Sequence, residues 1–379
     1  MTETIPRTLG ADRIVPWSGP IIDCDVHAAV PSLEALHPYQ SPMWLQWARE
    51  RGWKGPVGVA DAYPPGAPTS ARDEWRPPGG AVPASSLEML QRDLLDPLRV
   101  EQAVLTCYYG VDSLRHPDWA AALASAVNDW LLDQWLEKDP RLVGSIVIPA
   151  RDPVAAAKEI DRVGGNPRFR QVLVPIRSER LYGQRIFDPL YEAIVRNDLV
   201  MGLHWGGTTE GPPSTSGFAS WWIEEYAAEV QSYSAQLLTM IAEGVFQRFP
   251  ELRVSFLESG FTWVPSWCWR MNKEWTGLRR EIPWVDEPPF DLVRRHCRFS
   301  TAPTHAGPPE EMEKMLRWIG PETLMFGSDY PHRHDDEIGD LLDLMSADQQ
   351  AAVMAETARE WYRLERVNEN HGPHGPEGR

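Results

Sequence analysis

The sequence predicts an α/β fold, a (β/α)8 TIM barrel. Short apolar runs alternate with helical patterns along a chain of 379 residues, and eight of the runs have the length of a strand. Such alternation indicates parallel strands joined by right-handed crossovers, and eight strands is the number that closes a barrel. A doubly wound open sheet is the main alternative. No G-x-G-x-x-G or P-loop motif follows an early apolar run, so a doubly wound sheet would have no recognisable nucleotide-binding site in this sequence.

The first strand is predicted over residues 20–26, after an extended N-terminal arm at 1–19. Residues 38–83 are rich in Pro, Gly and Trp, which is typical of an irregular insert rather than a helix. We therefore expect a single barrel domain over 20–366, with this insert after its first strand and near its mouth. Residues 367–379 are rich in Gly, Pro and His and are expected to form a disordered tail.

The remaining strands are predicted from apolar runs that turn residues bound. They lie at 102–107, 142–148, 171–176, 199–204, 252–258, 298–301 and 323–328. Helices are predicted where apolar residues recur every three or four positions between start and stop signals. They lie at 86–98, 118–138, 154–163, 189–196, 220–249, 264–275, 309–318, 336–344 and 347–364. The helix at 118–138 illustrates the signals, because Asp118 can cap its start and Asp139-Pro140 ends it.

The composition is that of a globular protein, with 42% hydrophobic and 24% charged residues. The formal net charge of −17 opposes binding to nucleic acid or to an anionic membrane surface. No run approaches the roughly 20 apolar residues of a membrane span, and the N-terminus does not resemble a secretory signal. The four cysteines form no C-x-x-C pair. We therefore expect a reduced, cytoplasmic protein.

Five acidic and imidazole side chains stand at or just after the ends of predicted strands. Asp25 and His27 close the first strand, and His204 and Glu258 close the runs at 199–204 and 252–258; Asp329 follows the last. In a parallel barrel the carboxyl ends of all strands meet at one face, where active sites lie. Carboxylates and imidazoles are metal ligands and proton-transfer groups. The pattern favours a metal site, although His204 alone could be a core residue and Glu258 a ligand, a proton shuttle or a structural acceptor.

At these residues the sequence resembles the amidohydrolase superfamily, in the branch of α-amino-β-carboxymuconate-semialdehyde decarboxylase and related non-oxidative decarboxylases. The resemblance covers about residues 20–364. It is carried by short segments: Ile22-Asp23-Cys24-Asp25-Val26-His27, Val127-Asn128-Asp129-Trp130, Pro140-Arg141-Leu142, Leu203-His204-Trp205-Gly206-Gly207, Gly244-Val245-Phe246 and Phe326-Gly327-Ser328-Asp329-Tyr330-Pro331-His332.

The resemblance implies one divalent metal ion, Zn²⁺ or Mn²⁺, held by Asp25, His27, His204 and Asp329. It also implies a homodimer. Two features depart from the family pattern: Asp25-x-His27 replaces the usual His-x-His, and Glu258 replaces a histidine at the sixth strand. None of the chain's five lysines ends a predicted strand, so the carboxylated lysine that bridges two metals in binuclear members is not expected.

Three functions remain open, and each involves a small molecule. The first is non-oxidative decarboxylation of an aromatic or enoic acid, with Glu258 or His305 as proton donor, Arg177 pairing with a substrate carboxylate, and Trp205 at the site mouth. The second is hydrolysis of an amide, lactone or carbon–carbon bond, with Asp329 accepting the proton of water and Glu258 or His332 assisting the leaving group. The third is a non-catalytic barrel that binds a ligand. The resemblance favours the first.

Overall fold

A computed structural model describes residues 17–56, 70–207, 217–304, 307–334 and 338–366. Within these residues eight strands form one sheet in the order β1 to β8, and neighbouring strands run parallel. Their bounds are β1 Ile22–His27, β2 Gln102–Thr106, β3 Leu142–Val147, β4 Phe169–Arg177, β5 Val200–Gly207, β6 Arg253–Leu257, β7 Cys297–Ser300 and β8 Leu324–Met325.

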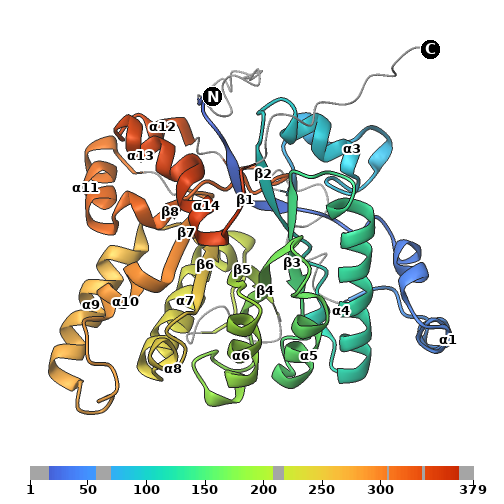
Figure 1. Cartoon of the computed structure of the whole chain (residues 1–379), viewed down its shortest axis with the longest axis horizontal. Helices are drawn as coiled ribbons and strands as arrows, with labels where there is room; N and C mark the ends of the chain where they lie inside the picture. Colours follow the sequence, from blue (N-terminus) through green and yellow to red (C-terminus); the bar gives the residue numbers. More distant parts are fainter. Residues whose placement is uncertain (1–16, 57–69, 208–216, 305–306, 335–337, 367–379) are drawn as a thin grey trace.

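The first and last strands meet and close the sheet. Val26 forms a parallel bridge with Tyr330, and the Cys24 amide donates a hydrogen bond of 2.9 Å to the Phe326 carbonyl. Figure 1 shows the strands at the centre of the molecule with helices ranged outside them. The predicted eight-stranded barrel is therefore confirmed.

The helices follow the strands in the order that the sequence predicts. Their bounds are α1 Pro42–Arg51, α3 Leu87–Leu90, α4 Pro117–Leu131, α5 Pro153–Val163, α6 Asp188–Arg196, α7 Trp222–Ala242, α8 Val245–Arg248, α9 Trp263–Leu278, α10 Pro289–His296, α11 Pro309–Ile319, α12 Ile338–Leu342, α13 Ala347–Ala351 and α14 Thr357–Tyr362. One turn of π-helix extends each of α3, α4 and α13.

Two features of the helices outside the insert differ from the prediction. The region 220–249 is not one helix, because Gly244 adopts φ 69° and separates α7 from α8. A Cβ on Gly244 would lie 2.5 Å from the Trp284 ring, so glycine is required there. The short helix α10 was not predicted, because its eight residues begin directly after a proline-rich turn.

The prediction of an irregular insert over residues 38–83 is wrong for its first part, which contains α1. Ser41 caps this helix by accepting a hydrogen bond from the Trp44 amide, Pro42 occupies its first turn, and Gly52 ends it at φ 60°. The exposed helix packs through its tryptophans: the ring of Trp47 lies 5.3 Å from that of Trp119 in α4. Tryptophans that suggested an irregular segment are thus the anchors of a helix.

The opposite end of the barrel from the site is closed by the C-terminal helix. The Tyr362 hydroxyl, in α14, lies 2.8 Å from Gln171 Oε1 and 3.0 Å from Ser255 Oγ, two buried polar groups near the start of β4 and β6. Trp361 and Tyr362 also pack with apolar residues at the start of the strands, namely Ile22, Val104, Val143 and Val200. Among the described residues, the interior is therefore filled at the amino ends of the strands, which leaves their carboxyl ends available for chemistry.

Some predictions fall on residues that the structure does not describe. These are residues 1–16 of the predicted arm, 57–69 of the insert, His305, and the predicted tail at 367–379. Among the described helices, none combines the length and the apolar character that crossing a membrane requires.

Candidate metal centre

Asp25 and His27 lie at the carboxyl end of β1, and Asp329 lies just after β8, the strand next to it in the closed barrel. His27 Nε2 is 2.9 Å from Asp329 Oδ1, although 302 positions separate the two residues in sequence. The Asp25 and Asp329 side chains are fully buried, and His27 is 13% exposed. Barrel closure thus brings together the first and last of the predicted site residues.

Asp23 fixes the backbone between these two segments. Its Oδ1 accepts hydrogen bonds from the Ser328 amide at 2.9 Å and from the Asp25 amide at 3.2 Å. Burial raises its pKa to about 7. The pairing of β1 with β2 shifts register between Asp23 and Val26, so the side chains of this strand do not alternate strictly between its two faces. Asp23 therefore links the segments that carry Asp25 and Asp329.

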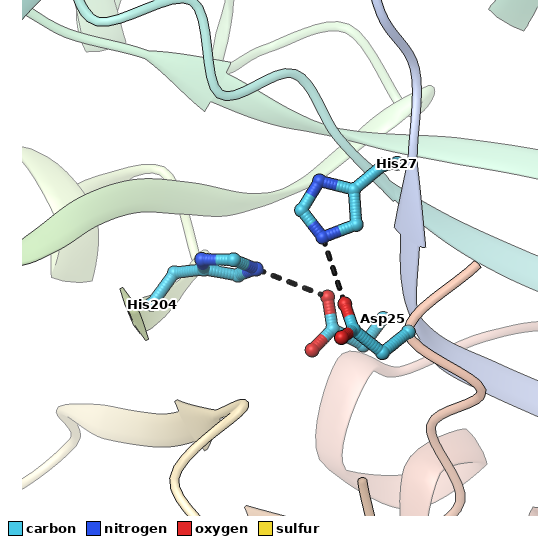
Figure 2. Close-up of side chains that lie close together, drawn as sticks. Asp25, His27 and His204 are labelled. Atoms are coloured by element: carbon cyan, nitrogen blue, oxygen red, sulfur yellow. Dashed lines mark hydrogen bonds and ion pairs between the residues drawn. The ribbon is translucent and has the colours of Figure 1, made fainter. Parts of the chain in front are cut away.

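His204 approaches the same point from β5, across the barrel. Its Nδ1 lies 2.7 Å from the Trp205 carbonyl, which only accepts, so Nδ1 carries a proton and Nε2 faces Asp25 Oδ1 at 3.3 Å. Burial disfavours a charged imidazole, but the Asp25 and Glu258 carboxylates and the Trp205 carbonyl together outweigh burial and raise the pKa of His204 to about 10. Figure 2 shows the imidazole of His204 directed toward the carboxylate of Asp25, with the imidazole of His27 beside them.

Asp25, His27, His204 and Asp329 together have the geometry of a cation site. One ligand atom from each lies within 4.8 Å of the others. Both Asp25 oxygens and His204 Nε2 are buried without a hydrogen-bond partner in the described chain. Unsatisfied buried carboxylate oxygens are costly unless a cation balances them. Carboxylate oxygens with imidazole nitrogens suit Zn²⁺ and Mn²⁺, so the four residues present fit a divalent ion.

Glu258 borders this set at the end of β6. Its Oε1 accepts a hydrogen bond of 3.1 Å from the Tyr226 hydroxyl, and its Oε2 lies 4.0 Å from His204 Nε2. Glu258 and Asp329 both adopt left-handed backbone, with φ 53° and 54°. Non-glycine residues in this region typically cost about 1–3 kcal/mol each and concentrate at functional sites.

Two further imidazoles complete the cluster. His332 packs edge-on against His27 with ring centroids 4.7 Å apart, and burial lowers its pKa to about 3, so it is neutral. His334 Nε2 lies 2.6 Å from Asp329 Oδ2. Burial alone would raise the pKa of Asp329, but its hydrogen bonds with the imidazoles of His27 and His334 hold it well below the usual range. The sequence reasoning overlooked His334; its signal was the His-x-His spacing of residues 332–334, directly after Asp329.

A cavity of about 540 Å³ opens above these groups. His27, His204, Glu258 and His332 form its floor, and apolar residues form most of its wall. The second half of the insert contributes much of that wall, as predicted for a segment near the mouth. The non-floor lining residues are Ala28, Ala29, Ser70, Arg76, Pro77, Gly80, Ala81, Val82, Pro83, Ala84, Tyr108, Trp205 and Pro331.

The two residues predicted to bind substrate are placed differently. Trp205 lines the cavity and packs against Trp222 and Tyr226. Arg177 is not brought there: it forms an ion pair with Glu225 of α7 and lines a separate cavity of about 200 Å³. Its position at the end of β4 is as predicted, but its side chain faces a different gap on the barrel face.

Comparison with known proteins agrees with this architecture. In sequence, the chain is 23% identical over 270 residues to a gamma-resorcylate decarboxylase from Rhodococcus jostii (strain RHA1), covering 67% of this chain and 80% of the relative. In structure, it is similar to a 5-carboxyvanillate decarboxylase from Novosphingobium aromaticivorans DSM 12444, complexed with manganese and 4-hydroxy-3-methoxy-5-nitrobenzoic acid. That match has a TM-score of 0.68 at 19% identity and covers 91% of this chain and 96% of the other.

A 2,6-dihydroxybenzoate decarboxylase complexed with 2,6-dihydroxybenzoate is also similar, with a TM-score of 0.67 at 17% identity, covering 91% of this chain and 99% of that one. At these identities the structural likeness establishes the fold. The sequence model of the Amidohydrolase family matches residues 22–364, nearly the whole described chain. The chain therefore belongs to the amidohydrolase family, as its motifs predicted.

Proposed function

We propose that this protein is a metal-dependent carboxy-lyase that removes the carboxyl group of a small aromatic acid without oxidation. The observation that carries the proposal is the set Asp25, His27, His204 and Asp329, of which His27 and His204 lie at the floor of a largely apolar cavity. Relatives that act on gamma-resorcylate and 5-carboxyvanillate support this substrate class. A planar ring fits the apolar wall, and a carboxylate fits the floor.

The four residues would hold one divalent ion, with manganese supported by the relatives that bind it and zinc as the other choice. When bound, the ion supplies a Lewis acid for the carboxylate and a neighbouring oxygen of the substrate. Asp23 would hold the β1 and β8 segments at a fixed separation. Trp205 and the insert would exclude water from the ring.

The reaction requires a proton at the ring carbon that loses its carboxyl group. As carbon dioxide departs, the electron pair of the broken carbon–carbon bond stays on that carbon and takes up the proton. Glu258 is the proposed proton donor, because Tyr226 fixes one of its oxygens and the other faces the site. His332 lines the cavity and packs against His27, so its proposed role is to orient the His27 ring. Its neutral imidazole adds no charge beside that ring.

The test is to incubate Mn²⁺-loaded protein with 2,6-dihydroxybenzoate and related benzoic acids in ¹⁸O-labelled water. The proposal predicts one carbon dioxide per substrate consumed and no ¹⁸O in the aromatic product. Incorporation of ¹⁸O into that product, with no carbon dioxide released, would instead identify a hydrolase. Unchanged ligand binding by metal-free protein, with no turnover of any substrate, would identify a ligand-binding barrel.

His204→Ala should abolish turnover, and His37→Ala, at an exposed histidine, is the matched control.

We also propose that the protein acts as a cytoplasmic homodimer on a small molecule and does not bind nucleic acid or membranes. The net charge of −17 supports the exclusion of polyanions. Light scattering coupled to size-exclusion chromatography tests this proposal. A dimer should have a mass of about twice 43.0 kDa.

A further inference from the structure

The cavity above the candidate metal centre is larger than an acid with a single ring requires. Its volume is about 540 Å³. A one-ring hydroxybenzoate packed at the density of a protein interior takes up roughly 200 Å³. A divalent ion with two waters adds roughly 100 Å³, because one water occupies about 30 Å³. A one-ring substrate therefore leaves roughly 40% of the cavity unfilled.

The aromatic side chains that line the cavity lie next to its floor. The Tyr108 ring stacks on the imidazole of His204 with centroids 6.1 Å apart, and its hydroxyl donates to Asp112 at 3.2 Å. Trp205 directly follows His204 and packs on Trp222 with ring centroids 5.6 Å apart. A substrate ring whose carboxylate reaches the floor would lie beside these two supported rings.

Most of the remaining wall is built from small and apolar residues. They come from the segment after β1 and from the insert: Ala28, Ala29, Pro77, Gly80, Ala81, Val82, Pro83 and Ala84. The two segments are joined, because the Ala29 amide donates a hydrogen bond of 2.8 Å to the Ala84 carbonyl. Ala84 is 1% exposed and Val82 is 44% exposed, so this wall extends from the interior to the mouth. Its short side chains leave the space that a one-ring acid does not fill.

This wall also carries little charge. Above the floor, Arg76 is the one lining residue of the described chain with a charged side chain. It donates to Ser70 Oγ at 3.3 Å and pairs with Asp73 Oδ1 at 3.5 Å. The Asp73 side chain is 79% exposed, so this ion pair directs the guanidinium toward solvent. The wall therefore favours an uncharged group over a second carboxylate.

We propose that the substrate is a bicyclic aromatic acid, with a hydroxyl group beside its carboxyl group and a second, uncharged ring. The inference rests on the proposed function and names the substrate class of the same site. The first ring lies beside Tyr108 and Trp205, with its two oxygen groups at the floor. The second ring fills the space against Ala28, Ala29 and Ala84. Cavities of about 300–1,000 Å³ typically enclose ligands of drug size, which agrees with a ligand larger than one ring.

The test compares two ligands that differ only by a fused ring, 2-nitrophenol and 1-nitro-2-naphthol. A nitro group has the planar shape and two oxygens of a carboxylate but cannot leave as carbon dioxide, so isothermal titration of Mn²⁺-loaded protein measures binding alone. The naphthol should bind at least roughly tenfold more tightly, because its second ring removes additional apolar surface from water. It should also bind more tightly than 4-hydroxy-3-nitrobenzoate, in which a second charged group replaces the second ring.

Two variants locate the second ring. Ala29→Leu and Val82→Trp place bulk in the wall and should each reduce the preference for the naphthol over the phenol to below about threefold. Ala347→Leu is the matched control, because Ala347 is exposed at the start of α13 and does not line the cavity; its preference should equal that of the wild type. The ratio of two affinities in the same variant is insensitive to a general loss of metal or folded protein.

Equal affinities for 1-nitro-2-naphthol and 2-nitrophenol would overturn the inference, as would tighter binding of 4-hydroxy-3-nitrobenzoate than of the naphthol. A preference that persists in both wall variants would also overturn it, because the second ring would then lie elsewhere. Carbon dioxide release from 2-hydroxybenzoate and 2-hydroxy-1-naphthoate tests the proposed function separately. Release without a naphthol preference would contradict only this inference, and a naphthol preference without release from any acid would contradict only the proposed reaction.

Discussion

Glu229 is a carboxyl group buried in α7 that the proposed chemistry does not use. It is 3% exposed, and Arg177 and Ser232 offset its burial only in part. Burial raises its pKa to about 8, from 4.5 for an ordinary glutamate. The folded protein therefore binds a proton that the unfolded chain lacks at pH values between about 4.5 and 8. Its contribution to stability falls as pH rises through that interval.

Glu229→Gln should remove this penalty. Urea unfolding should show that the free energy of unfolding of the variant exceeds that of the wild type by up to about 5 kcal/mol at pH 8.5. At pH 5 the difference should be less than about 1 kcal/mol. Glu243→Gln, at an exposed residue just after the same helix, is the control and should show no such pH-dependent gain. A gain of equal size at both pH values would contradict the assigned cause.

The sequence reveals the strand-end residues better than the residues of the connecting loops. Asp25, His204 and Asp329 were predicted to converge because the carboxyl ends of barrel strands meet at one face. His334 lies in the segment beyond β8, where no periodicity indicates which way a side chain points. Arg177 shows the same limit: its place at the end of β4 is predictable, but its pairing with Glu225 depends on how α7 packs.

At the scale of the element, the end of β5 depends on Gly206. This residue adopts φ 122°, and a Cβ there would lie 2.8 Å from Tyr108 Cζ. The Tyr108 ring stacks against His204, with centroids 6.1 Å apart, and its hydroxyl donates to Asp112 Oδ1 at 3.2 Å. The glycine thus allows the strand to pass close to the ring that supports a proposed ligand.

Gly206→Ala should displace Tyr108 and loosen His204. We expect about 1–3 kcal/mol lower stability from strain and roughly tenfold or greater loss of Mn²⁺ affinity, measured by isothermal titration. Gly217→Ala is the matched control, because φ is 128° there and a Cβ would meet none of the described residues within 4 Å. Equal losses of affinity in the two variants would show that strain alone, and not the Tyr108 contact, is responsible.

Helices and strands were predictable where the periodicity of apolar residues or the length of an apolar run was clear. They were less predictable where the assignment depended on amino-acid composition alone. Residues 38–83 were assigned as irregular from their Pro, Gly and Trp content. Yet Pro42 and Gly52 mark the start and end of α1, so the same residue types were boundary signals. What makes this short helix stable is its packing on Trp119 of α4, which only the folded structure reveals.

At the scale of the whole molecule, the two ends of the barrel have different roles. Contacts at the amino ends of the strands stabilise the fold, and the carboxyl ends carry the candidate metal centre. Tyr362 donates to Gln171 Oε1 or Ser255 Oγ at the amino ends of the strands, far along the barrel from the candidate metal centre. Tyr362→Phe should cost about 1–3 kcal/mol, because it leaves buried polar groups short of a partner.

Urea unfolding measures that cost, and Mn²⁺ affinity should be unchanged. Tyr109→Phe is the control, because the buried Tyr109 hydroxyl has no hydrogen-bond partner in the described chain, and its removal should change stability by less than about 0.5 kcal/mol. Equal destabilisation by the two changes would contradict the role given to Tyr362.

The proposed chemistry depends on a cation at the carboxyl ends of the strands. The most direct measurement is an anomalous difference map from crystals grown with Mn²⁺, recorded near the manganese absorption edge. We expect a strong peak within bonding distance of Asp25, His27, His204 and Asp329 together. A map with manganese bound elsewhere, and no peak among these four side chains, would contradict it.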